Sequence, residues 1–391
     1  MALKYPLANG NWSNAANWNG GTVPAIGDDV RANGFTVTID VDINVSQIST
    51  LALVPAVAGG AFAVTTSRNI TANINAGTTS CLTSASAIIV TIIGNMTGGA
   101  TSGANGVSFT NAGSILNVTG NATGGSFINL NPHGLNSTGT VIFVGNAFAG
   151  VTANAFIAGI NIGVTGNLTF TGNATALNNR TYGIQCAGNG TYNGTITGGN
   201  SSISAGVNLP SGIHTINSNV IGGTGSSPGI LVAGATLTVN GTVTGGNGAL
   251  GAQLTTTTAT FNGDIIGSSS SASQGLYVTD TVSVVTVSTM TFSVIGTTPI
   301  YGFVKFKNTA PTVTVRKANN TNQTLVDPST TDIPIVGNVR DGIVYATGSL
   351  TGTFKVPSPL TVALGVPTDN TVGSGVITIG DMGTLLASYI V

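Results

Sequence analysis

The feature that most constrains this chain of 391 residues is an internal repeat between Gly94 and about Gly267. Each copy has a short apolar stretch, a Gly-Asn or Asn-Gly step, a second apolar pair and a loop. The copies include IIGNMTGG, NVTGNATGG, FVGNAFAG, FTGNATA, YNGTITGG, VNGTVTGG and FNGDIIGS. Repeats of this length stack on one another, so the chain extends one continuous core instead of building several globular ones.

The spacing of the repeat predicts the architecture. A small residue recurs at the centre of each copy every 22 to 27 residues, at Gly94, Gly120, Gly145, Gly172, Gly194, Ser218, Gly241 and Gly263. Two or three short β-type runs per period, with Gly and Asn at corners, are typical of a right-handed parallel β-helix. Leucine-rich repeats and propeller blades fit neither the composition nor the period. We therefore predict an all-β protein with eight or so coils, in a rod roughly 40 Å long at about 4.8 Å per coil.

Changes in composition divide the chain into three predicted parts. Residues 1–50 form an N-terminal β cap or first coil, residues 51–300 the parallel β-helix, and residues 301–391 a C-terminal β-rich module. Charged residues and prolines return after residue 300, which predicts short strands and extended links. The last twelve residues, 380–391, are expected to hold one short helix capped near Asp381.

The N-terminal part carries two signals. The segment Phe35–Val45 alternates apolar and polar residues, which predicts one half-buried strand. The chain's only tryptophans are Trp12 and Trp18. An open solenoid end must be covered, so we predict that they plug it. A sugar-stacking surface is the alternative.

The residues around these signals carry a resemblance. The pattern Asn11–Pro24, then Gly27-Asp-Asp-Val30, then Thr-Val-Thr-Ile-Asp resembles the start of G8-type and related β-solenoid surface modules. The resemblance covers roughly residues 10 to 50. It implies an N-terminal cap or first coil.

A second resemblance lies near the C-terminus. Residues 339–359 (VRDGIVYATGSLTGTFKVPSP) and 365–373 (GVPTDNTVG) resemble C-terminal segments common in virion structural proteins of tailed bacteriophages. About 50 residues are covered. The resemblance implies a virion protein without saying which part of the particle contains it.

The distribution of charge argues against a reaction centre. Residues 43–263 contain no Asp or Glu, and their only charged residues are Arg68 and Arg180. Glycoside hydrolysis needs two carboxylates, and polysaccharide lyases need a base with charge stabilisers. We therefore expect no enzymatic activity, no catalytic residue and no cofactor. A net charge of -1 without a basic patch argues against binding to nucleic acid.

A few residues remain candidates for metal or redox chemistry. Asp28, Asp29, Asp40 and Asp42 form the one acidic cluster, and Asp40 and Asp42 would lie about 7 Å apart on one strand face. Such a pair is conceivable for Ca²⁺; a solvated edge that discourages aggregation is the favoured alternative.

The two histidines and the two cysteines stand apart in the sequence. We interpret His133 and His214 as surface or hydrogen-bonded imidazoles rather than ligands, and expect no metal site. Cys81 and Cys186 are either paired or, as we favour, buried free thiols.

The N-terminus has no apolar segment of the kind found in secretory signal peptides. The longest apolar run, about 14 residues from Leu51, is too short to span a bilayer, so no membrane insertion is expected.

These observations lead to one functional hypothesis and two rivals. The chain is expected to be a structural protein of a phage virion, assembled in the host cytoplasm: a fibre, spike or capsid-decorating appendage. Its expected partners are two further copies in a homotrimer, other capsid or tail proteins, and host surface glycans. The rivals are a secreted or cell-surface β-solenoid adhesin and a tailspike polysaccharide depolymerase. The missing signal peptide weighs against the first, and the acid-free coils weigh against the second.

Overall fold

The computed structural model describes most of the repeat region and isolated parts of the remainder. It describes residues 2–52, 59–126, 132–150, 157–177, 181–200, 204–225 and 227–263. Beyond these it describes Ile265–Ile266, Gly275–Thr279 and the strands from β33 (Val284–Val287) to β40 (Thr371–Val372). The chain divides into two compact units, Met1–Asp327 and Pro328–Val391.

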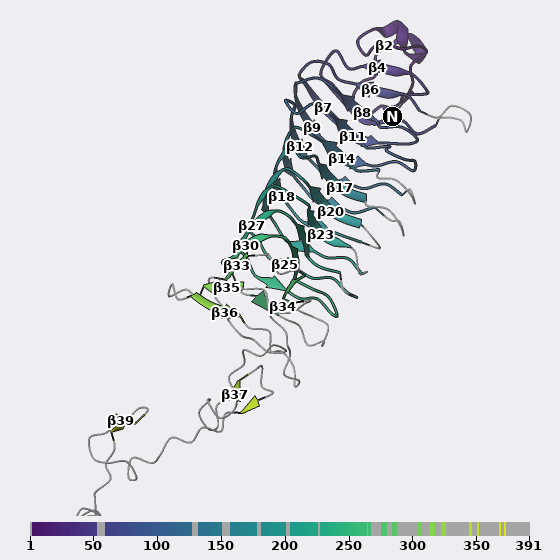
Figure 1. The fold of residues 1–391 in the computed structure, drawn as a ribbon. Helices are drawn as coiled ribbons and strands as arrows, with labels where there is room; N and C mark the ends of the chain where they lie inside the picture. Colours follow the sequence, from purple (N-terminus) through teal and green to yellow (C-terminus); the bar gives the residue numbers. More distant parts are fainter. Residues whose placement is uncertain are drawn as a thin grey trace, which may run out of the picture. The chain divides into compact units, whose positions relative to one another are not determined.

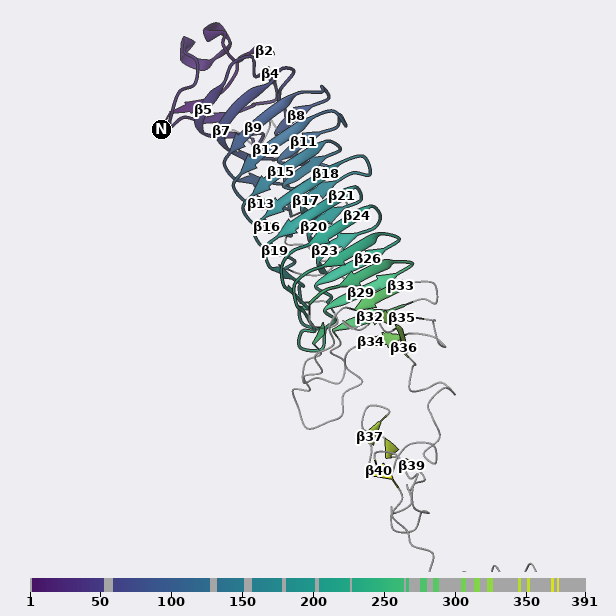
Figure 2. The same ribbon diagram turned by 90° about the vertical axis from the view of Figure 1, so that its left-hand side faces the viewer.

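The first unit contains a right-handed parallel β-helix of about 10 turns, which confirms the predicted fold class. Successive coils stack one on the next, as Figures 1 and 2 show. The expected number of eight coils was too low because parallel pairing already begins at β1 (Leu3–Lys4), which pairs with β3 (Asp29–Arg31). It continues to β34 (Val304–Phe306).

Three ladders of parallel strands run along the stack. The first ladder is a sheet of 13 strands. Its strands are β2 (Gly10–Asn11), β4 (Thr36–Thr38), β6 (Ala61–Ala63), β8 (Leu82–Ser84), β11 (Val107–Phe109), β14 (Leu135–Ser137), β17 (Ile157–Ile162), β20 (Thr181–Cys186), β23 (Ala205–Leu209), β26 (Ile230–Ala233), β29 (Ala252–Thr255), β32 (Leu276–Val278) and β34.

The second and third ladders belong to one sheet of 21 strands, which also contains β1, β3 and β5 (Ile43–Ser49). They diverge at β7 (Arg68–Asn75), whose first half pairs with β9 and whose second half pairs with β10. The second ladder is β9 (Ile89–Ile93), β12 (Ile115–Thr119), β15 (Thr140–Val144), β18 (Asn167–Thr171), β21 (Asn189–Asn193), β24 (Ile213–Ile216), β27 (Thr236–Val239), β30 (Thr258–Phe261) and β33. The third is β10 (Met96–Thr97), β13 (Ala122–Thr123), β16 (Ala147–Phe148), β19 (Ala174–Thr175), β22 (Ile196–Thr197), β25 (Val220–Ile221), β28 (Val243–Thr244) and β31 (Ile265–Ile266).

The core runs along the inside of the coils. In β15, Val141 and Phe143 are buried, whereas Ile142 and Val144 point outward. Phe143 stacks on Phe170 of the next coil with 5.7 Å between ring centroids. Because each coil buries the same strand positions, one apolar column continues from coil to coil. Burying an aliphatic or aromatic side chain of this size stabilises the fold by about 1.5–3 kcal/mol.

The central small residue of each repeat lies where a second-ladder strand turns into a third-ladder strand. Gly145 has φ 141°, and a Cβ on it would overlap the carbonyl oxygen of Gly120 in the preceding coil. The close approach recurs at the equivalent glycines, which explains why the repeat keeps them. Ser218 is the exception, and its hydroxyl donates to the carbonyl oxygen of Gly194.

The predicted single strand from Phe35 to Val45 is wrong. The chain forms β4 in the first ladder and β5 in the other sheet, with a corner between them. Val41 at this corner is 39% exposed. The inward alternation continues on both sides of a coil corner, so period 2 alone does not reveal the turn.

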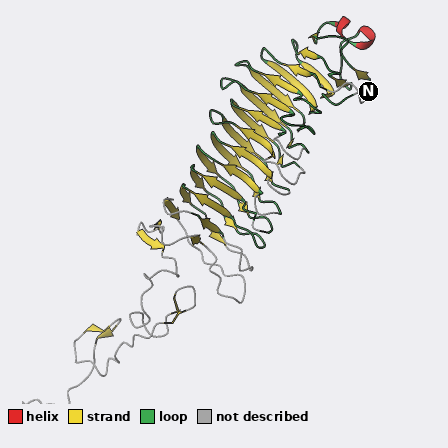
Figure 3. Ribbon diagram, turned by 45° about the vertical axis from the view of Figure 1, so that its right-hand side comes forward, coloured by secondary structure: helices red, strands yellow, loops and turns green. Residues whose placement is uncertain are grey.

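The N-terminal end is closed by the two tryptophans, as predicted. Trp12 and Trp18 are 1% and 0% exposed, and their rings meet edge to face at 4.9 Å. Trp12 also packs on Phe62, and the Trp18 indole N–H donates to the Trp12 carbonyl oxygen at 2.8 Å. Buried rings cannot serve as a sugar-stacking surface, so that alternative is wrong. Two short 3₁₀ turns, η1 (Ala15–Asn17) and η2 (Asn19–Gly21), lie at this end of the stack (Figure 3).

The remaining described strands pair in antiparallel hairpins. In the first unit, β35 (Val313–Arg316) pairs with β36 (Asn322–Leu325). In the second unit, β37 (Val344–Tyr345) pairs with β38 (Leu350–Thr351), and β39 (Pro367–Thr368) pairs with β40. The helix expected near Asp381 lies outside the described residues, and the predicted boundaries near residues 50 and 300 stay predictions.

Candidate functional site

The four N-terminal aspartates do not converge on one point. The Asp28 carboxylate accepts hydrogen bonds from the backbone N–H groups of Ala25, at 3.0 Å, and Ala2, at 3.2 Å. The bond from Ala25 is the main reason why the pKa of Asp28 is lowered. This carboxylate therefore ties the N-terminal segment to the first coil.

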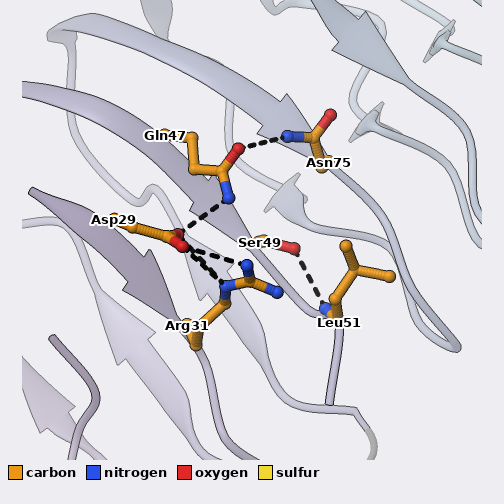
Figure 4. Close-up of polar contacts among 6 residues, drawn as sticks. All are labelled: Asp29, Arg31, Gln47, Ser49, Leu51 and Asn75. Atoms are coloured by element: carbon orange, nitrogen blue, oxygen red, sulfur yellow. Dashed lines mark hydrogen bonds and ion pairs between the residues drawn. The ribbon is translucent and has the colours of Figure 1, made fainter. Parts of the chain in front are cut away.

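Asp29 lies in a separate network on the outside of β3, β5 and β7 (Figure 4). Its carboxylate pairs with Arg31 at 2.9 Å and accepts a hydrogen bond from the Gln47 amide at 2.8 Å. The Gln47 oxygen in turn accepts from the Asn75 amide at 2.9 Å. The charge of Asp29 is thus neutralised by its own neighbour.

Asp40 and Asp42 close the corner between β4 and β5. Burial alone would raise the pKa of Asp40, but hydrogen bonds from the Ser13 hydroxyl and backbone hold it below its ordinary value. Asp42 accepts from the backbone and amide N–H groups of Asn69 at 2.9 and 2.8 Å, which lowers its pKa. Within the described residues no group of three or more His, Cys or Asp side chains is placed to hold a metal ion.

His133 is buried, so the surface interpretation is wrong and the hydrogen-bonded one holds. Its backbone N–H donates to the Asn105 side chain at 2.8 Å, and its Nδ1 accepts from the Ala158 backbone N–H at 3.1 Å. Burial lowers the pKa of His133 to about 4. The imidazole is neutral, and through its ring and its backbone N–H the residue links three consecutive coils.

His214 belongs to a buried cluster that the sequence did not reveal. Its Nε2 lies 2.7 Å from the Ser211 carbonyl oxygen and its Nδ1 3.3 Å from the Tyr192 hydroxyl. A carbonyl only accepts, so Nε2 carries the proton and Nδ1 accepts from Tyr192. A Cβ on Gly190 would overlap the Tyr192 hydroxyl. A glycine at an inward strand position, next to a tyrosine, was the available signal.

Cys81 and Cys186 are both free and buried, as favoured from the sequence. Burial raises the pKa of the Cys81 thiol, and it raises that of Cys186 to about 11. Neither thiol is a ready nucleophile, since the thiolate is the reactive form.

The outward side of the second ladder from β9 to β30 is a regular surface, which we name the β9–β30 face. Its strands are held in register coil by coil. Outward positions on β9, β12 and β15 include five β-branched aliphatic residues: Ile89, Ile93, Ile115, Ile142 and Val144. On β18, β21, β24, β27 and β30, 11 of the 12 outward positions are Thr or Asn, the exception being Ile213.

Two rows on this face are especially regular. Thr169, Thr191, Thr215, Thr238 and Thr260 occupy one register column. Beside them runs an amide ladder in which each Asn donates to the side-chain oxygen of the Asn one coil earlier. The ladder joins Asn193, Asn217, Asn240 and Asn262, with distances from 2.7 to 2.9 Å.

Neither of the two described helical turns is long and apolar enough to cross a membrane.

No protein-family model matches the chain, and no curated protein or solved structure matches it either. The candidate site proposed below is the patterned β9–β30 face.

Proposed function

We propose that this chain is a structural protein of a phage virion, displayed on the particle as a fibre, spike or capsid-decorating appendage. A β-solenoid fold is compatible with fibre, spike and adhesin roles. The resemblance of residues 339–373 to virion proteins narrows this range to a phage particle.

One observation carries the proposal: from β1 to β34 the described strands stack in parallel ladders, and the β9–β30 face carries no charged residue. Between Arg68 and Asp264 the sequence has a single charged residue, Arg180, which lies outside the described residues. Such a stack transmits force through many backbone hydrogen bonds. It offers solvent Thr and Asn side chains instead of acids and bases.

The role is mechanical and adhesive under this proposal. Three copies assemble with capsid or tail proteins in the host cytoplasm, and uncharged surface side chains contact host glycans. Neither nucleic acid nor membrane insertion is part of the mechanism. No residue is assigned a catalytic or cofactor-binding role.

Gradient-purified particles test the proposal. Peptides of this chain should be enriched with the other virion proteins in mass spectrometry and should remain after washing in high salt. Recovery only from the soluble lysate or the cell envelope would contradict a virion role. Recovery from the envelope would support the adhesin alternative.

The depolymerase alternative has its own test. Purified chain is incubated with host capsule or lipopolysaccharide, and new reducing or unsaturated ends are measured. We expect none above a buffer control, because the coils from Ile43 to Gly263 hold no carboxylate. A steady increase in either kind of end would contradict the proposal that the chain is not an enzyme.

A further inference from the structure

The β9–β30 face is large enough to be an interface. Eight strands of the second ladder, about 4.8 Å apart and four or five residues long at about 3.3 Å per residue, cover roughly 500–600 Å². A standard protein–protein interface buries about 800 Å² on each partner. The face alone therefore supplies most of the area that a standard interface needs.

One end of the face exposes apolar side chains that the chain itself leaves uncovered. Ile89, Ile93, Ile142 and Val144 are 50%, 52%, 45% and 47% exposed. They lie on β9 and β15, on either side of β12. Scattered surface aliphatics need no explanation, but four of them within three consecutive coils of one flat face form a patch.

At the other end of the face, a row of threonine hydroxyls is available for hydrogen bonding. Among the described residues, the hydroxyls of Thr169, Thr191, Thr215, Thr238 and Thr260 have no hydrogen-bond partner. They stand one coil apart, in a row. Surfaces that carry the same row at the same spacing could satisfy them coil by coil.

We infer that the β9–β30 face is the surface on which copies of this chain meet, with their solenoid axes parallel. The face carries no charged residue from β9 to β30, so a copy adds neither repulsion nor an unpaired charge. A rotation axis parallel to the stack brings each coil level with the same coil of its neighbour. The apolar end then covers the apolar end, and the threonine row lies along its equivalent.

An antiparallel arrangement lacks this match, because it places Ile93 and Val144 opposite Thr and Asn side chains. A partner with ordinary surface charge would bury those charges against groups that cannot neutralise them. The inference rests on the proposed function only for the number of copies, which that proposal sets at three.

Light scattering on the purified full chain tests the inference. Wild-type protein should have a mass at least twice that of one chain, 38.6 kDa, at micromolar concentration. The double variant Ile142→Thr/Val144→Thr keeps β-branched residues, so its circular dichroism should not change, while its dissociation constant rises roughly tenfold or more. Ile221→Thr is the matched control, since Ile221 is 40% exposed but lies on β25 in the third ladder. It should assemble like wild type.

Cross-linking provides a second measurement that does not depend on weakened assembly. Both native thiols are buried, so a new surface cysteine is the only reactive one. Ile142→Cys should form intermolecular disulfides under mild oxidation, and Ile221→Cys should not. A monomeric wild-type chain, or equal cross-linking of both variants, would overturn the inference. If the chain is monomeric but is found in virions, the interface inference fails and the virion role stands. If it is oligomeric but absent from virions, the virion role fails and the interface inference stands.

Discussion

Glycine and asparagine have different structural roles at the corners of the coils. The glycine lets the backbone approach the coil before it, and the neighbouring Asn holds the two coils together. The side-chain oxygens of Asn73, Asn95, Asn121 and Asn146 each accept from the backbone N–H of the next Asn, at 2.9 to 3.1 Å. From Asn193 onward the Asn precedes the corner residue and the ladder becomes one of side-chain amides. The two residue orders found in the repeat, Gly-Asn and Asn-Gly, thus correspond to two hydrogen-bonding patterns.

Replacing a corner glycine should be costly. Gly145→Ala places a Cβ on the Gly120 carbonyl oxygen at a φ that L-residues rarely adopt. We expect a loss of about 2–3 kcal/mol in the free energy of unfolding, measured by denaturant titration. Gly103→Asn is the control, since Gly103 has φ 65° and open space around its Cα, and Asn tolerates that conformation. A variant Gly145→Ala as stable as this control would contradict the steric account.

The buried imidazole of His133 makes stability depend on pH. Its pKa is about 4 in the folded chain, against about 6.5 when unfolded. Above pH 6.5 both states are neutral and the full stability is present. As pH falls from 6.5 to 4, only the unfolded state takes up the proton, so stability falls by about 3 kcal/mol.

The matched variant for this prediction is His133→Gln, whose amide does not titrate. The free energy of unfolding is measured for both proteins at several pH values between 7 and 4. The difference between them should change by about 3 kcal/mol over that range. His214, whose burial also lowers its pKa, contributes equally to both proteins and cancels. Parallel curves would show that His133 is not the group responsible.

Among the elements, the N-terminal coil is the one with a separate optical signal. The only tryptophans of the chain, Trp12 and Trp18, both lie in it, so intrinsic tryptophan fluorescence reports on this cap alone. We expect blue-shifted emission that iodide does not quench. Red-shifted, quenchable emission from the native chain would contradict the buried plug.

Removing one ring should loosen the cap. Trp18→Ala deletes a side chain that is 0% exposed and should lower the free energy of unfolding by about 3–5 kcal/mol. Ile26→Ala in the same coil is the control, since Ile26 is 78% exposed, and its effect should stay within about 0.5 kcal/mol. Both are measured by thermal or denaturant unfolding, followed by circular dichroism.

The sequence predicted some elements and missed others for identifiable reasons. Period and corner residues were enough for the β-helix, because the steric demand at Gly120 or Gly145 is local and repeats. The corner at Val41 was missed because inward alternation continues on both sides of it. The contact of Tyr192 with His214 joins residues 22 positions apart, and only the coil register brings them together.

The candidate surface was also beyond the sequence alone. Whether Ile89, Ile93, Ile142 and Val144 face the core or solvent depends on which strand positions point inward. Strand alternation gives two possible answers until the register is known. The four N-terminal aspartates were grouped because they are close in the sequence. In the structure they have different partners, and Asp40 and Asp42 lie at the corner between β4 and β5.

At the scale of the whole molecule, the structure places stability in the contacts between neighbouring coils. Each coil touches mainly the coil before and the coil after it, which makes the stack quasi-one-dimensional. Under the proposed function, length and lateral assembly are the properties that this stack contributes. This is the physical basis for proposing an appendage rather than an enzyme.

Imaging of particles with and without this chain tests that account most directly. Virions from wild-type phage and from a phage lacking this reading frame are purified and reconstructed by cryo-electron microscopy. We predict a projecting density on the wild-type particle that the parallel β-helix fits, with several copies side by side, and its loss from the mutant. Identical particles, with no density that fits the stacked coils, would contradict the account.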